Sequence, residues 1–340
     1  MNIILFYPGL GKRGGITPDV RYLEAELRKH GHQVRSARTL TQLLRGEHGP
    51  GTLVNIYGCV PSFRLFLAII STRARRQRFI WTPVFHPRRQ AIWQGAGPYR
   101  VMKYFDRAAP RLARIAHGVS AATPAEAEFF RSMGARRVAV VPLVAGDRHA
   151  RFEGVDRLRA RHRLGLGSEP VVLIIAAHSP RRKGLDFAAN VLSALRADLP
   201  EATYLLVGGG DLGPLAGLPG VRALGWCPDE LLQDAYRCAD VLFVPSIYEQ
   251  FSRVTIEAWA CELPVVLTDG VALAPMAEQA DAGRVVTFGD VAGAAAELRR
   301  ALTDPDWCRL AGKRGQQLVA EHFLPATHLR ATLELYSALR

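Results

Sequence analysis

The stretch VLFVPSIYEQFSRVTIEAWACELPVVLTDG, residues 241–270, contains a strand, a loop, a helix and a second strand in succession. The apolar run 241–245 predicts a buried strand, and Ser252 is a suitable N-cap for the helix that follows. The β-branched run that begins at Pro264 predicts the next strand. This order is typical of a βαβ unit in a parallel sheet.

The same alternation of short apolar runs and helical periodicity extends along the whole chain. In the first half we expect strands at residues 3–7, 33–36, 52–57, 79–84, 118–121 and 138–141. In the second half we expect them at residues 171–176, 203–207, 221–224, 241–245, 264–267 and 283–286. The chain is therefore predicted to be an α/β protein with two doubly wound parallel sheets.

Between these halves, residues 145–170 are polar, rich in arginine and without strand character, which favours a domain boundary near residue 150. We expect one Rossmann-like domain at residues 1–150 and another at residues 151–325. A last helix, 326–340, could pack against either domain, and we expect it to cross back to the first.

Charge is divided unevenly between the two halves. Residues 1–150 hold 24 Lys and Arg against 8 Asp and Glu, a net charge of +16, and the remainder hold 20 against 23, a net charge of −3. The first half is thus expected to meet an anionic partner, such as a membrane surface or an acidic acceptor. An arginine-rich surface without such a role is the open alternative.

Composition also indicates a compartment. The five cysteines are scattered, without metal-ligand spacing, which favours a reducing cytoplasm and no structural zinc. No signal peptide is evident, and no apolar segment is long enough to span a bilayer. We expect a cytoplasmic protein, soluble or peripheral at the inner face of the cytoplasmic membrane.

Two glutamates mark the expected binding site. Glu249 lies in the loop after a predicted strand, and Glu257 lies in the second turn of the next helix, eight residues later. Ligands of open α/β sheets bind beyond the carboxyl ends of strands, and the amides near Phe251 and Ser252 can receive a phosphate at the helix start. Two acids placed in this way can bind two ends of one ligand.

With these motifs, the chain resembles the retaining glycosyltransferases of family 4, which have the GT-B fold. Further motifs in the order of that family are the GG at Gly14 and Gly15, His86 after a strand, and KG at Lys183 and Gly184. VGGGD at 207–211 and ALGWCPDELLQDAYRCADVLFVPS before Glu249 follow. The resemblance implies two Rossmann-like domains facing across a cleft, with the acceptor bound by residues 1–150 and the nucleotide sugar bound by residues 151–325. It also implies a metal-independent transfer from a nucleotide-diphosphate sugar.

The resemblance also implies roles for single residues. Glu249 would contact the donor sugar near its anomeric centre, Glu257 would accept hydrogen bonds from the ribose hydroxyls, and His86 would reach the donor sugar. Gly14 and Gly15 would let the backbone approach the donor.

The donor diphosphate would be held by Lys183 and by an arginine. Ala177 and His178 stand where the family usually has Gly-Arg, so Arg181 or Arg182 is expected to substitute, with a solvated basic turn as the alternative. No metal or cofactor is expected. The acceptor could be a glycan, a lipid-linked glycan or a small-molecule aglycone. Double displacement and same-face transfer both stay open; we favour the latter.

The sequence leaves other functions open. The G-x-G-x-x-G match at 9–14 is compatible with an NAD(P) oxidoreductase, but the second strand ends in Arg35 and Arg38 without the acid that would bind a ribose diol. An arginine could bind a 2′-phosphate, so an NADP-dependent oxidoreductase stays open. A same-fold nucleotide-sugar epimerase and a basic membrane- or nucleic-acid-binding protein also remain, although no nucleic-acid motif is present. Asp304-Pro305-Asp306 is interpreted as a helix cap.

Overall fold

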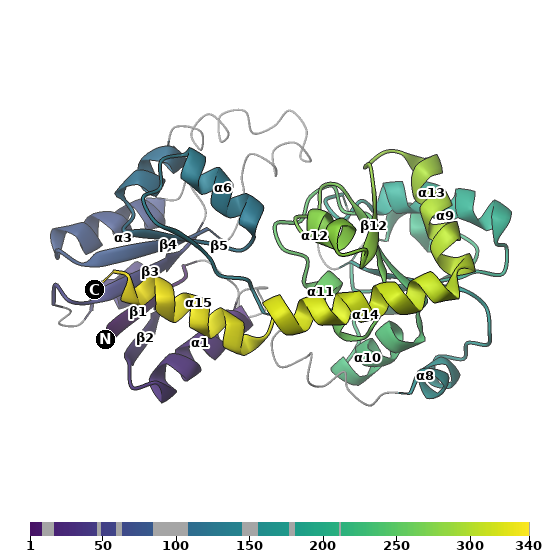
Figure 1. Cartoon of the computed structure of the whole chain (residues 1–340), viewed down its shortest axis with the longest axis horizontal. Coiled ribbons are helices and arrows are strands. Elements are labelled where there is room, and N and C mark those ends of the chain that lie inside the picture. The colour runs from purple at the N-terminus through teal and green to yellow at the C-terminus, as the bar shows by residue number, and fades with distance from the viewer. Residues whose placement is uncertain are drawn as a thin grey trace. The chain divides into compact units, whose positions relative to one another are not determined.

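The computed structural model describes residues 1–8, 17–45, 49–58, 63–83, 108–144, 156–176, 181–210 and 212–339. The chain divides into two compact units (Figure 1). The first unit comprises Met1–Gly146 together with Leu324–Arg340, and the second comprises Asp147–Phe323. Each unit is built around one parallel sheet, as the alternation of apolar runs predicts.

The sheet of the first unit has six parallel strands in the order β2-β1-β3-β4-β5-β6. They are β1 (Asn2–Phe6), β2 (Gln33–Ala37), β3 (Leu53–Tyr57), β4 (Arg78–Thr82), β5 (Gly118–Ala121) and β6 (Val138–Val140). Each lies within two residues of a predicted strand, because β-branched and apolar runs bounded by turn residues are a strong signal for buried parallel strands.

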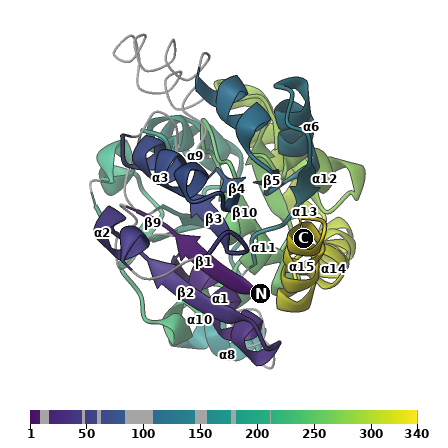
Figure 2. The ribbon, with the colours of Figure 1, turned by 90° about the vertical axis from the view of Figure 1, so that its left-hand side faces the viewer.

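Helices cover both faces of this first sheet (Figure 2). Alternate residues of β1 point to opposite faces: Ile3 and Leu5 pack with one set of helices, and Ile4 and Phe6 with the other. The first set is α1 (Thr17–Lys29) and α15 (Pro325–Ser337). The second set includes α2 (Leu40–Leu44), α3 (Phe63–Ala74), the helical residues 108–115 and α6 (Pro124–Ser132).

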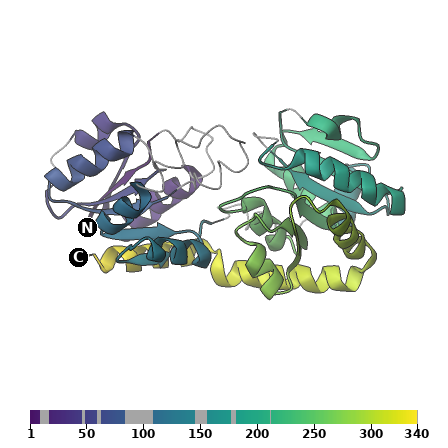
Figure 3. The same ribbon diagram turned by 90° about the horizontal axis from the view of Figure 1, so that it is seen from above.

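The last helix of the chain belongs to the first unit, where it lies against the sheet (Figure 3). Tyr336 of α15 is 1% exposed, and its hydroxyl accepts a hydrogen bond from the Asn55 amide of β3 at 2.8 Å. Asn55 in turn accepts a bond from the Thr82 hydroxyl of β4 at 2.7 Å. A buried polar network therefore fixes the position of α15 on the sheet.

The sheet of the second unit also has six parallel strands, in the order β12-β11-β10-β7-β8-β9. They are β7 (Val171–Ile175), β8 (Thr203–Val207), β9 (Val221–Gly225), β10 (Val241–Val244), β11 (Val265–Thr268) and β12 (Gly283–Val286). The helices are α8 (Arg157–Arg163), α9 (Leu185–Asp198), α10 (Asp229–Cys238), α11 (Arg253–Ala260), α12 (Ala274–Gln279), α13 (Val291–Thr303) and α14 (Pro305–His322), with a 3-10 turn at Gly213–Gly217.

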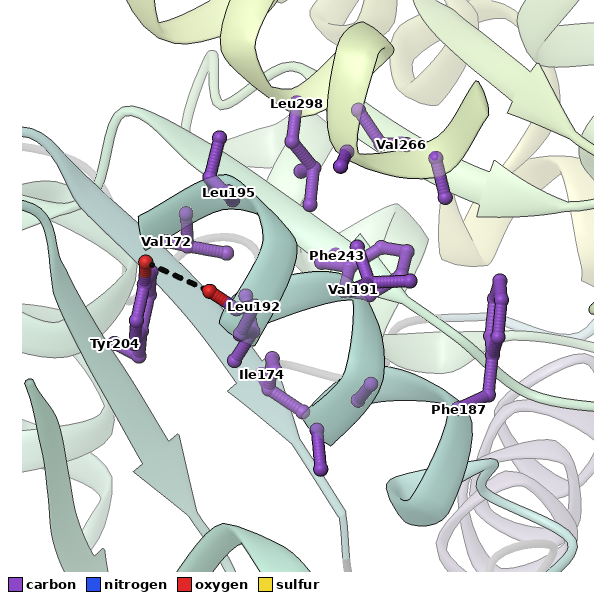
Figure 4. Close-up of a cluster of buried hydrophobic side chains, with 14 of the residues drawn as sticks. Val172, Ile174, Phe187, Val191, Leu192, Leu195, Tyr204, Phe243, Val266 and Leu298 are labelled. Atoms are coloured by element: carbon purple, nitrogen blue, oxygen red, sulfur yellow. Dashed lines mark hydrogen bonds between the residues drawn. The ribbon is translucent and has the colours of Figure 1, made fainter. Parts of the chain in front are cut away.

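One core of the second unit lies between the sheet and the helices α9 and α13. Leu192 and Leu195 of α9 pack over Val172 of β7, together with Leu298 of α13 (Figure 4). The Tyr204 hydroxyl donates to the carbonyl of Leu192 at 3.2 Å, so the one polar group at this point is satisfied.

The strand order of the second sheet fixes where a ligand can bind. From β7 the chain proceeds outward to β8 and β9, and it then returns to β10 on the other side of β7. The loops after β7 and β10 therefore diverge to opposite faces at a topological switch point, where open α/β sheets form ligand crevices.

We predict that Tyr336→Phe destabilises the first unit by about 1 kcal/mol, because Asn55 loses one acceptor while the packing of the ring is kept. Urea unfolding followed by tryptophan fluorescence, which includes the signal of buried Trp81, measures this loss. Glu334→Gln, on the exposed side of the same helix, is the matched control. Equal stability of the two variants would show that the network does not hold α15 in place.

Candidate active site

Glu249 lies in the loop after β10, and its backbone fixes it beside the chain that leaves β11. Its N–H donates to the carbonyl of Gly270 at 3.2 Å, and its carbonyl accepts the N–H of Ala272 at 2.9 Å. These two bonds form an isolated parallel bridge with Val271. The loop is thus an extension of the sheet, and it places the Glu249 side chain at the switch point.

Two cations from the loop after β7 meet the Glu249 carboxylate. Lys183 Nζ and a guanidinium nitrogen of Arg182 each lie 2.7 Å from the same oxygen, Oε1. The Ser246 hydroxyl is 3.3 Å from that oxygen, and Arg182 also donates to the carbonyl of Tyr248 at 3.2 Å. The structure therefore brings together Glu249, Arg182 and Lys183, three residues that the sequence analysis assigned to one site.

Glycines let the two loops approach so closely. Gly184 has φ of +66°, and a Cβ at this position would overlap the carbonyl oxygen of Pro245. A Cβ at Gly270 would overlap the carbonyl oxygen of Ile247 in the same way. The N–H of Ile247 donates to the carbonyl of Arg182 at 3.0 Å. Only glycine fits at these two positions, and the Lys-Gly pair thereby places both cations beside Glu249.

The charge state of Glu249 follows from this environment. Burial raises its pKa, but the neighbouring charges of Lys183 and Arg182, with their hydrogen bonds, outweigh burial and lower the pKa below the usual value. The carboxylate is therefore ionised at neutral pH. It can stabilise a positive charge or orient a hydroxyl, but it is not a proton donor at that pH.

Glu257 lies in the second turn of α11 and is only 4% exposed. Its Oε2 accepts a hydrogen bond from the hydroxyl of Tyr236 at 2.7 Å. Glu257 is therefore a buried residue and not an exposed glutamate on the helix surface. Tyr236 is not among the residues predicted from the sequence, although a tyrosine on the apolar side of α10 is a group that needs a buried partner.

The start of α11 differs in one detail from the expectation. Ser252 is the N-cap residue, as predicted, but its side chain does not cap the helix. Its oxygen instead accepts a bond from the Thr255 hydroxyl at 2.7 Å. The Phe251 ring packs against Phe323, with 5.9 Å between centroids, so Phe251 can offer a ligand its backbone rather than its ring. The first amides of α11 carry no bond from the Ser252 side chain and can face an anion.

Several other predicted features can be placed. Arg181 is exposed, whereas Arg182 is the arginine that reaches Glu249. Asp304 accepts the N–H of Trp307 at 2.9 Å at the start of α14, which confirms its role as a cap. Gly14, Gly15, His86, Ala177 and His178 lie outside the described residues.

Among the described residues, no group of three or more His, Cys, Asp or Glu side chains is arranged to hold a metal ion. No helix among them has the length and apolarity needed to cross a membrane.

Comparison with known proteins identifies a family for the unit that holds this site. Residues 169–304, which include all four charged site residues above, match the model of the family described as glycosyl transferases group 1. D-inositol 3-phosphate glycosyltransferase 1 of Catenulispora acidiphila is 36% identical over 171 residues, which are 45% of this chain and 41% of that protein. The chain thus matches less than half the length of this relative.

Solved structures agree over the whole chain. Sucrose-phosphate synthase from Thermosynechococcus elongatus superposes with a TM-score of 0.80 at 23% identity, covering 100% of this chain and 99% of that one. Anabaena HepE in complex with UDP gives a TM-score of 0.73 at 17% identity, covering 99% and 100%. Residues 169–304 therefore match the glycosyl transferases group 1 family, and the chain as a whole has the GT-B fold.

Proposed function

We propose that this protein is a retaining glycosyltransferase that moves a sugar from a nucleotide-diphosphate sugar to an acceptor without a metal ion. The observation that carries the proposal is the ionised Glu249 carboxylate, held by Arg182 and Lys183 at the switch point of a group 1 domain. The UDP complex of the similar HepE structure supports a nucleotide-sugar donor.

In this proposal the donor diphosphate binds to Arg182, Lys183 and the first amides of α11. Two cations and a helix amino terminus would offset the negative charge that grows on the leaving nucleoside diphosphate. That is the contribution a metal ion makes in other transferases, so none is required here. Glu257, fixed by Tyr236, would accept the ribose hydroxyls.

Glu249 would act as an anion at the sugar. Its lowered pKa keeps it charged, so it can stabilise the positive charge that develops at the sugar ring in the transition state. We favour same-face transfer, in which the leaving phosphate takes the acceptor's proton, with Glu249 orienting the sugar. His86, Gly14 and Gly15 keep their proposed roles toward the donor.

The acceptor is proposed to be anionic or lipid-linked and to bind the first unit, since the first 150 residues carry the net charge of +16. The name of the Catenulispora relative includes D-inositol 3-phosphate, which supports a phosphorylated acceptor. A lipid-linked acceptor would bring the enzyme to the inner face of the cytoplasmic membrane.

The donor is identified by thermal shift. UDP, GDP, dTDP and ADP sugars are compared, and the ligand that binds the native state raises Tm. At a ligand concentration of 100 times Kd, the free energy of unfolding rises by about 2.7 kcal/mol. A shift with NADPH and with none of the four nucleotide sugars would instead favour an oxidoreductase.

With that donor, Glu249→Gln is expected to lower the transfer rate by about 100-fold or more, because a neutral amide cannot stabilise positive charge at the sugar. Initial rates of sugar transfer measure the effect, and circular dichroism checks the fold. Glu278→Gln, an exposed residue of α12 in the same unit, is the control and should retain full activity. Full activity of Glu249→Gln would refute the assignment.

The same variant predicts a change in the pH dependence of stability. Because the folded-state pKa of Glu249 is lowered, its stabilising contribution is present above the unfolded value of 4.5 and is lost as pH falls through the folded pKa. Wild type should therefore lose more stability than Glu249→Gln between pH 6 and pH 3, as measured by urea unfolding at each pH. Parallel profiles would mean that the two cations do not lower the pKa of Glu249.

Tyr236→Phe tests the role of Glu257. Loss of the phenol is expected to raise the KM for the donor several-fold with little change in kcat, since ribose binding is the same in ground and transition states. Tyr204→Phe is the matched control, because Tyr204 is another buried tyrosine of this unit whose hydroxyl bonds only to the Leu192 carbonyl in the described structure. An equal rise in KM for both variants would contradict the role.

A further inference from the structure

The first unit contains a cavity of about 680 Å³ that the proposed transfer reaction does not use. It lies where β4 begins at Arg78 and just before β5 and β6 begin. This is the amino edge of the sheet, opposite the carboxyl edge where α/β proteins bind substrates. The charged side chains that line it are Arg73, Arg78, Arg114, His117, Arg136 and Arg137.

The arginines of this pocket have no carboxylate partner among the described residues. In the part of the chain that the structure describes, none of the five forms an ion pair with a carboxylate, and Arg137 donates to the carbonyl of Ala338. Other arginines of the protein do have acidic partners: Arg157 pairs with Asp240, and Arg163 pairs with Asp234. The pocket therefore holds a concentration of positive charge that has no carboxylate partner among the described residues.

The carboxyl ends of three helices lie near the arginines and reduce the repulsion among them. The helix α3, the helical residues 108–115 and α6 all end close in sequence to the strands that start at this edge. The negative ends of their dipoles offset part of the repulsion among the arginines. Such an offset equals a fraction of a charge per helix, so five guanidiniums still leave a strongly positive cavity.

His117 lies within this pocket, and its pKa responds to the positive charge of the arginines around it. The Phe79 N–H donates to His117 Nδ1 at 3.1 Å, so the proton of the neutral ring is on Nε2. Burial, together with Arg73, Arg78 and Arg136, lowers the pKa of His117 below its usual value. The imidazole is thus neutral at pH 7, and it can donate a hydrogen bond from Nε2.

We propose that this arginine pocket is a second anion site, which binds a phosphate group carrying two or more negative charges. Guanidiniums hold phosphate oxygens through paired hydrogen bonds, and several of them converging on one cavity are typical of such recognition. The phosphate can belong to a small soluble molecule or to a phosphomonoester lipid headgroup, since the chemistry of binding is the same. The site is independent of the proposed sugar transfer.

Binding is measured by NMR on the His117 imidazole of the full chain, titrated with inorganic pyrophosphate. Pyrophosphate can also bind at Arg182 and Lys183, but the His117 signal reports the first unit's pocket. A bound anion stabilises the imidazolium, so the pKa of His117 should rise on saturation.

Arg78→Gln and Arg136→Gln should each weaken this binding by about tenfold or more, the size expected for a charge-assisted hydrogen bond. Neither should lower Tm, because each removes repulsion. Arg21→Gln, which removes an exposed charge from α1 of the same unit, is the control and should bind as wild type does.

The source of the phosphate is distinguished by a second arm with vesicles of phosphatidylcholine, with and without phosphatidic acid. A response to pyrophosphate without sedimentation by phosphatidic acid vesicles supports a soluble ligand. Sedimentation only with phosphatidic acid vesicles, lost in Arg78→Gln, supports a headgroup. No response of His117 to pyrophosphate and no binding to either vesicle would overturn the proposal. Equal weakening by Arg21→Gln would also overturn it, since binding would then follow net charge alone.

Discussion

The contact of one carboxylate oxygen with two cations determines the architecture of the site in the second unit. Glu249 belongs to the loop after β10, and Arg182 and Lys183 belong to the loop after β7. Their pairing joins the two loops that diverge at the switch point. The backbone reinforces the link, because Gly184 permits direct contact with Pro245. The crevice edge is thereby ordered before a ligand arrives, which reduces the entropy cost of binding.

Stability alone does not explain this arrangement. Removing charges from water costs several kcal/mol per ion, and a buried ion pair repays that cost only in good geometry, so apolar replacements are often as stable. Here one anion faces two cations, which leaves an excess of one positive charge. A site with this excess favours a ligand that brings negative charge, and that requirement is met by a diphosphate. The excess positive charge therefore indicates that Glu249, Arg182 and Lys183 serve ligand binding rather than stability.

Prediction from sequence worked best where the signal is local. The twelve strands were placed within two residues, because a buried parallel strand is a short apolar run between turn residues. The position of Glu249 followed from its place after such a strand. By contrast, its contact with Arg182 rather than Arg181 depends on how the turn before Gly184 is oriented, and two adjacent arginines carry no local signal for that.

The sequence did not predict the hydrogen-bond partners of Ser252 and Glu257, because several neighbouring groups compete for each side chain. Ser252 occupies the N-cap position, but the Thr255 hydroxyl bonds to its oxygen, so the side chain leaves the helix amides uncapped. Tyr236 and Glu257 belong to different helices, and only packing shows that the tyrosine satisfies the carboxylate. Propensity describes what a residue can do locally, whereas its actual bond is chosen by the tertiary neighbours.

The sequence also shows an excess of arginine without showing where the arginines gather in the fold. The excess of arginine in the first half is evident from composition, yet the five arginines of the pocket are spread from residue 73 to residue 137. Parallel topology gathers them, because every strand of such a sheet begins at the same edge. The carboxyl edge of the sheet stays separate from this concentration of charge. The pocket lies at the amino edge of the sheet, and the length of the strands separates it from the carboxyl edge.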